Sequence, residues 1–173
     1  MATTQYNAPR RTISRLTTSE TLTAASATAV GTGTIDYNGV NVGDYIRIYG
    51  RGIFRTNGGS QTLEMTVPID GTSIATTGAV TLQNISTAVT FEYEVLLRVT
   101  AVGSSGGLLC SAIMRSATET AGTLDMSGQI TDTSADTVDF TSTDGVTVGV
   151  AFAWGAANAS NTLTITHQVV EIL

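Results

Sequence analysis

Lysine is absent from the 173 residues, and the chain has only one cysteine, one histidine and two prolines. The single cysteine, Cys110, cannot form an intrachain disulfide, which fits assembly in a reducing compartment. One histidine and one cysteine cannot supply the three or four ligands of a zinc site. No run approaches the roughly 18 apolar residues of a membrane span. Residues 1–19 lack the apolar stretch of a secretory signal, so we expect none.

Charge is also scarce, because only 13% of the residues are charged. The 14 acids outnumber the eight bases, all arginine, and give a net charge of −6. Binding to phosphate groups depends on clustered basic side chains, so we expect neither nucleic acid nor a membrane as partner. The charge is unevenly spread. Residues 1–19 carry three arginines and no acid, whereas residues 20–173 carry five arginines and all 14 acids.

Threonine, serine and glycine are abundant, with 32, 14 and 18 residues. This composition favours strands and tight turns and excludes helix bundles and coiled coils. Because 42% of the residues are hydrophobic, the chain is not an acidic disordered tail. Its length predicts one domain, and we place that domain at residues 20–173, after an extended N-terminal arm at residues 1–19.

Alternating apolar and polar residues predict about eight to ten strands in this domain. The clearest segments are residues 44–56, 61–70, 72–76, 88–102, 108–117, 123–131, 146–154 and 161–173. No helical rhythm separates them, so the pattern predicts an all-β fold, a two-sheet antiparallel sandwich most naturally of jelly-roll type. An immunoglobulin-type sandwich is the nearest alternative, but this chain is long for one and lacks the Cys…Trp…Cys signature.

The alternation also assigns faces. In residues 88–102, Phe91 and Tyr93 share the predicted core face, and Glu92, Glu94 and Arg98 point the other way. In the last segment, continuous alternation places His167 on the same face as Leu163 and Ile165.

In residues 146–154 the valines and aromatics share one face, and we expect Trp154 in the core. Thr147, Gly149, Ala151 and Ala153 form the opposite face. Their small side chains suit contact with another surface.

The N-terminal arm has too few apolar residues to fold alone, so it is either a frayed terminus or a segment that lies on its own body or on another chain. In the second case, apolar side chains would anchor the arm and its arginines would meet acidic groups. The predicted docking residues are Tyr6, Arg10, Arg11, Ile13 and Arg15.

Groups for catalysis are few. His167 lies in an apolar strand, and a single histidine can take part in few catalytic mechanisms. Glu92 and Glu94 lie about 7 Å apart by strand rise, close to the spacing a glycosidase needs, but the same pair describes an ordinary solvent face. We therefore predict no catalytic residues and no enzyme, with a glycan-cleaving enzyme as an alternative.

Metal and cofactor sites are equally weakly indicated. The acids Asp125, Asp132, Asp136, Asp139 and Asp144 do not follow the spacing of an EF-hand, so a solvated rim is expected and an ion there stays open. The glycine clusters do not form a P-loop or a dinucleotide fingerprint, and we predict no metal and no cofactor.

Aromatic side chains keep carbohydrate binding open. Tyr45, Tyr49, Tyr93 and Trp154 each offer a ring on which a sugar could stack.

Two stretches resemble a known family: residues 39–76, GVNVGDYIRIYGRGIFRTNGGSQTLEMTVPIDGTSIAT, and residues 146–173, VTVGVAFAWGAANASNTLTITHQVVEIL. They are similar to jelly-roll virion proteins of tailed bacteriophages, in which a GD.I.I...G strand, a glycine-rich turn, a second strand and a W....N.....T....V.EI ending recur. The resemblance extends over about the last 150 residues.

This resemblance implies one of two roles, both commonly trimeric. One is a capsid decoration (cement) protein, and the alternative is a tail-fibre, receptor-binding or glycan-binding module. Small size, an N-terminal arm and the lack of a fibre repeat favour the first. The expectation is a homotrimer, assembled in the host cytoplasm, that binds across neighbouring major capsid subunits on the outer face of the capsid and stabilises the shell.

Overall fold

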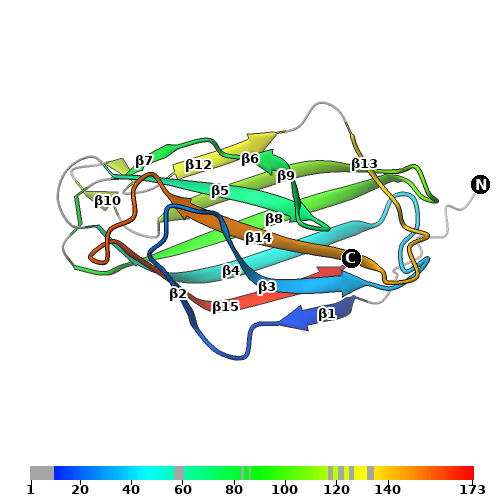
Figure 1. Ribbon diagram of the computed structural model, residues 1–173, viewed down its shortest axis with the longest axis horizontal. Helices are drawn as coiled ribbons and strands as arrows, with labels where there is room; N and C mark the ends of the chain where they lie inside the picture. Colours follow the sequence, from blue (N-terminus) through cyan, green and yellow to red (C-terminus); the bar gives the residue numbers. More distant parts are fainter. Residues whose placement is uncertain are drawn as a thin grey trace, which may run out of the picture.

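The computed structural model describes residues 10–56, 61–82, 84–85, 87–116, 119–120, 123–124, 127–131 and 135–173. These residues form two antiparallel β-sheets that pack face to face (Figure 1). The two-sheet antiparallel sandwich predicted from the sequence is therefore confirmed. None of the described segments is a helix long and apolar enough to cross a membrane.

The large sheet has the order β1-β15-β4-β8-β9-β12, with β2 also on β15 and β13 also on β9. Its strands are β1 (Arg11–Arg15), β15 (Thr162–Ile172), β4 (Tyr45–Arg55), β8 (Val89–Ala101), β9 (Gly106–Ser116), β12 (Ser127–Thr131), β2 (Glu20–Leu22) and β13 (Asp136–Val138).

The small sheet has the order β3-β14-β5-β6, with β7 also on β5, and β10 and β11 form a separate pair. Their bounds are β3 (Thr28–Ile35), β14 (Val146–Trp154), β5 (Gln61–Ile69), β6 (Thr72–Thr76), β7 (Val80–Leu82), β10 (Glu119–Thr120) and β11 (Thr123–Leu124).

The core lies between the sheets and is built from the inward face of each strand. Phe91, Tyr93 and Phe152 pack together there, with the Tyr93 and Phe152 ring centroids 5.2 Å apart. Trp154 is buried as predicted, and its indole N–H donates to the Leu22 carbonyl oxygen at 3.1 Å. Cross-sheet packing of aromatic side chains therefore holds the two layers together.

The hairpin between β5 and β6 is closed by a two-residue turn. Asp70 and Gly71 have φ of 48° and 79°, as a type I′ turn requires. Pro68 points away from the core, and the register with β6 shifts between Val67 and Pro68. The missing N–H of proline is thus accommodated by a break in pairing.

A bulge in β15 overturns the predicted alternation of that strand. Ile165 pairs with Gly52 and His167 pairs with Arg51, so Thr166 is an extra residue on the β15 side. One extra residue moves every later side chain to the opposite face. Gln168, and Val170 beyond it, consequently point into the core, and the placement of His167 with Leu163 and Ile165 is wrong.

The bulge brings the Gln168 amide between the sheets, where it is 1% exposed. Its Nε2 donates to the Val30 carbonyl oxygen at 2.9 Å and to that of Gly31, both in β3. Its Oε1 accepts a hydrogen bond from the Tyr93 hydroxyl. One buried amide thereby links β15, β8 and the opposite sheet, and every polar atom in it has a partner.

Gly50 makes room for this arrangement. A Cβ at position 50 would lie 2.2 Å from Cζ of Tyr93 and 2.3 Å from its hydroxyl oxygen. Glycine is required at this position because the Tyr93 ring occupies the space that a side chain would need.

Residues 11–22 pair with the body of the same chain. β1 pairs with the end of β15, and β2 pairs with its beginning, so both strands line the same edge of the large sheet. Between them, the Leu16 amide donates to the Gln168 carbonyl oxygen at 2.9 Å, and Ile13 and Leu16 pack against the core. The division into an arm at residues 1–19 and a domain at residues 20–173 stays a prediction.

Replacing Gly50 by alanine is expected to lower the free energy of unfolding by about 1–3 kcal/mol, because the new methyl group displaces the Tyr93 ring. Urea denaturation measures the change. Ser111→Ala, at an exposed position of β9, is the control and should stay within about 0.5 kcal/mol. An unchanged stability of the Gly50 variant would contradict this packing.

Burial, with a smaller contribution from the charge of Glu20, raises the pKa of the Tyr93 phenol above its usual 10.0. Above pH 10 the unfolded chain therefore loses this proton while the folded chain keeps it, and stability falls by up to about 1.4 kcal/mol per pH unit. Tyr93→Phe should be about 1–3 kcal/mol less stable at pH 7, because Oε1 of Gln168 loses its donor, and should decline less steeply above pH 10. Denaturation curves from pH 7 to 11 test both effects, and equal slopes would contradict the second.

Candidate functional site

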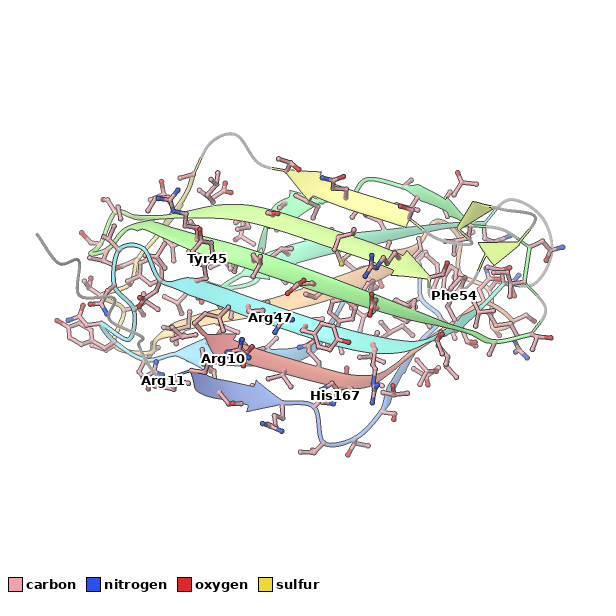
Figure 2. All side chains as sticks on the ribbon, turned by 180° about the vertical axis from the view of Figure 1, so that it is seen from behind. Arg10, Arg11, Tyr45, Arg47, Phe54 and His167 are labelled. Atoms are coloured by element: carbon pink, nitrogen blue, oxygen red, sulfur yellow. The ribbon has the colours of Figure 1, made fainter. Side chains whose placement is uncertain are left out.

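The outer face of the large sheet carries a network of charged and aromatic side chains centred on Arg47 (Figure 2). Its Nε lies 2.6 Å from Oε1 of Glu94, and its second guanidinium nitrogen lies 3.2 Å from Oε1 of Glu171. Burial by itself lowers the pKa of Arg47, but the hydrogen bonds and charges of Glu94 and Glu171 outweigh it and the net pKa is raised. Three neighbouring strands, β15, β4 and β8, are joined at this point.

Tyr49, two residues along β4, is held from two sides. The Arg47 guanidinium carbon lies 5.3 Å from the centroid of its ring, and the His167 ring meets it edge-on at 6.5 Å. His167 reaches this position only because the β15 bulge turns it outward. The phenol ring is therefore fixed on the sheet surface.

Glu92 is also paired. Both contacts from Arg115, at 2.8 Å and 2.6 Å, go to Oε1 of Glu92. The two carboxylates singled out from the sequence, Glu92 and Glu94, thus each engage an arginine. That the chain is not an enzyme stays a prediction.

A groove of about 410 Å³ opens on this face where β15, β4 and β8 run side by side. We call it the Tyr49 groove. Its lining is Tyr49, Arg51, Gly52, Ile53, Thr90, Phe91, Glu92 and Thr166, of which Phe91 is buried.

Two smaller hollows continue from the Tyr49 groove across the sheet. The first, about 40 Å³, includes Tyr49 and Glu92 and adds Glu94 and Ile113. The second, about 230 Å³, shares Glu94 and Ile113 and extends to Gln129. The register Tyr49–Glu94–Ile113–Gln129 places these side chains in one row across four strands.

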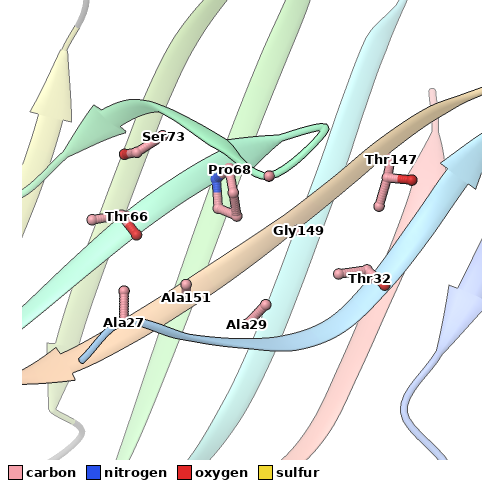
Figure 3. Close-up of a pocket in the computed structure, with 10 residues that line it drawn as sticks. Ala27, Ala29, Thr32, Thr66, Pro68, Ser73, Thr147, Gly149 and Ala151 are labelled. Carbon is pink, nitrogen blue, oxygen red and sulfur yellow. The ribbon is translucent and has the colours of Figure 1, made fainter. Parts of the chain in front are cut away.

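The outer face of the small sheet is different in kind. It has a hollow of about 300 Å³, the small-sheet hollow, whose lining contains no charged and no aromatic side chain (Figure 3). Its lining is Ala27, Ala29, Thr32, Thr66, Pro68, Gly71, Ser73, Thr147, Gly149 and Ala151. The small outward face predicted for residues 146–154 is confirmed and lies at the centre of this hollow.

The predicted docking residues of the arm are partly engaged within the chain itself. Arg10 lies 3.9 Å from Oε1 of Glu171, and Arg11 donates to the Gly39 carbonyl oxygen at 3.2 Å. Ile13 is half-buried, whereas Arg15 is exposed and, within the described residues, has no ion pair. Tyr6 lies outside the described residues. Their role in docking stays a prediction.

Of the four aromatic residues considered for sugar stacking, Tyr93 and Trp154 are buried in the core and cannot receive a ligand. Tyr45 is 40% exposed at the start of β4, outside the three hollows. Tyr49 is left as the ring that lines a groove. Arg51 was not singled out from the sequence, although its place in the outward row of β4 was the available signal.

Among the described residues, the acidic side chains between positions 125 and 144 do not form a metal site. The described part of the chain contains no group of three acidic, histidine or cysteine side chains placed to hold an ion. Asp125 and Asp132 lie outside the described residues. The carboxylate of Asp139 accepts from the Thr141 hydroxyl and amide, and these hydrogen bonds lower the pKa of Asp139.

Comparison with protein-family models and with curated proteins finds no match. Among solved structures, the chain is similar to the CBM2 module of the evolved Dit of Lactobacillus casei BL23 phage J-1, with 16% sequence identity and a TM-score of 0.36. The match covers 87% of this chain and 74% of that one. An identity and a TM-score this low support no inference about the role of this chain.

Proposed function

We propose that this chain is a structural protein of a tailed-phage virion, a capsid decoration protein that acts as a homotrimer. It binds across neighbouring major capsid subunits on the outer face of the shell. The observation that supports the proposal most directly is the small-sheet hollow, whose small, uncharged lining side chains allow another protein surface to approach closely. The resemblance of residues 39–76 and 146–173 to jelly-roll virion proteins supports the same role.

Strand order supports the jelly-roll part of the proposal. The large sheet contains β1 and β2, β15, β4 and β8 in that order, and the small sheet contains β3, β14, β5 and β6. From β2 to β5 each strand lies in the sheet opposite its predecessor, as does β15 after β14. Two four-stranded sheets linked in this way are the arrangement of a double-sheet jelly roll, and β9, β12 and β13 extend one of them.

The mechanism is one of contact rather than of bond-making. A protein that binds only the assembled shell stabilises it by linkage, by about 4 kcal/mol at a thousandfold excess over the dissociation constant. Subunits of the shell then separate only if these contacts are also lost. The exposed Arg15 on the edge strand β1 offers a charge to an acidic neighbour.

Ala29 tests the small-sheet hollow, because it is an exposed residue in the lining. Ala29→Arg should leave the fold intact but turn the trimer into monomers and abolish capsid attachment, since a long charged side chain holds the opposing surface away. Sedimentation velocity and capsid co-sedimentation measure the two effects. Ser111→Arg, exposed on the other sheet, is the matched control. A trimer that tolerates Ala29→Arg would rule out this face as the subunit interface.

Arg15 tests the edge strand. Arg15→Glu should reduce capsid occupancy at least tenfold at low salt while leaving the melting temperature unchanged, because Arg15 has no ion pair within the described residues. Arg55→Glu, at an exposed position at the end of β4, is the charge-matched control. Equal occupancy for both variants and the wild type would remove the proposed docking role of the arm.

A further inference from the structure

We infer that the Tyr49 groove and the two hollows beside it form a binding site for an extended, neutral oligosaccharide. The site lies on the outer face of the large sheet, whereas the small-sheet hollow lies on the opposite sheet. It is therefore independent of the proposed trimer interface, and the inference holds whether or not the decoration role is correct.

The groove combines the groups that recognise a sugar ring. Tyr49 supplies an aromatic ring to the lining of the groove, and such a ring can stack on the C–H face of a pyranose. Because Arg47 and His167 fix this ring before binding, little conformational entropy is lost when a ligand arrives.

Hydrogen-bonding groups surround the ring. The Arg51 guanidinium makes no ion pair or side-chain hydrogen bond in the part of the chain that the structure describes. Among the described residues, the contacts of Arg115 with Glu92 go to Oε1, so Oε2 of this carboxylate can accept from a ligand. Thr90 and Thr166 belong to the same lining; the Thr166 hydroxyl donates to the Arg51 carbonyl oxygen at 3.2 Å and can still accept from a ligand. A donor, an acceptor and two hydroxyls around one ring match vicinal sugar hydroxyls.

The charge of the groove favours a neutral sugar. The linings of the Tyr49 groove and the small hollow contain two basic side chains, Arg51 and Arg115, and two carboxylates, Glu92 and Glu94, so they offer no net positive charge to an acidic sugar. A neutral, hydroxyl-rich ligand can accept a charge-assisted hydrogen bond from Arg51 and donate one to Glu92.

The row of hollows sets the length of the ligand. The Tyr49 groove shares two residues with the small hollow, which in turn shares Glu94 and Ile113 with the hollow that ends at Gln129. From β4 to β12 the row crosses three strand spacings, roughly 14 Å at about 4.8 Å each. This length accommodates more than one sugar ring, laid across the strands.

Isothermal titration calorimetry with maltohexaose, cellohexaose, laminarihexaose and chitohexaose tests the inference on the full chain. The wild type should bind at least one of these with a dissociation constant below about 1 mM. Arg51→Ala and Glu92→Gln should each weaken that binding roughly tenfold or more, because a charge-assisted hydrogen bond is lost. Tyr49→Ala should weaken it at least as much, and Tyr49→Phe should stay within about threefold, because it retains the ring.

Tyr45→Ala is the matched control, an exposed tyrosine of the same strand outside the hollows, and should bind as the wild type does. Arg51 is exposed, so its variant stays informative even if Tyr49→Ala unfolds. No binding to any of the four sugars, or equal losses for Tyr45→Ala and Tyr49→Ala, would overturn the inference. Loss of capsid attachment by Arg51→Ala without loss of sugar binding would instead make this face a protein interface.

Discussion

The single extra residue in β15 is the constraint on which both the core and the outer face depend. Because Thr166 has no counterpart on β4, the residues after it in β15 alternate one position out of step with those before it. This shift puts the Gln168 amide between the sheets and the His167 ring beside Tyr49. A strand of strict alternation would bury a histidine and expose an amide. The same local irregularity therefore fixes the packing of the two layers and shapes the surface above it.

The two outer faces of the sandwich are chemically opposite. The small sheet presents alanine, glycine and threonine in its hollow, with no charge to desolvate when another surface covers it. The large sheet presents paired arginines and glutamates around a fixed tyrosine. Covering the surface of the small sheet costs little desolvation free energy. The surface of the large sheet keeps polar groups that can hydrogen-bond to a hydrated, hydroxyl-rich ligand. The proposed assembly surface and the proposed sugar site thus lie on different sheets.

Sequence patterns predicted the strands that alternate without interruption. β8 and β14 have the faces that their apolar residues indicate, and the Asp70-Gly71 turn has the geometry that its residues favour. β3 was not predicted, because Gly31 and Gly33 interrupt its apolar row and Gly31 takes a φ of 50°. The bulge in β15 has no signature among the residues around Thr166, so the face of His167 was assigned wrongly.

The candidate site was predictable only in part, for a related reason. Tyr49 stood out as an aromatic residue and Glu92 as an outward-facing one, but these two residues, 43 positions apart, meet only through the register between β4 and β8. Register is set by the whole sheet and not by either strand, so no local pattern reports it. Arg51 becomes part of the candidate site only because this register brings Tyr49 and Glu92 together.

The pairing of β1 and β2 with β15 joins the first strands of the chain to the last. During synthesis β1 and β2 have no partner until β15 has left the ribosome, so this edge of the large sheet can close only then. Contacts between residues so distant in sequence slow folding and leave Ile13 and Leu16 exposed in the nascent chain.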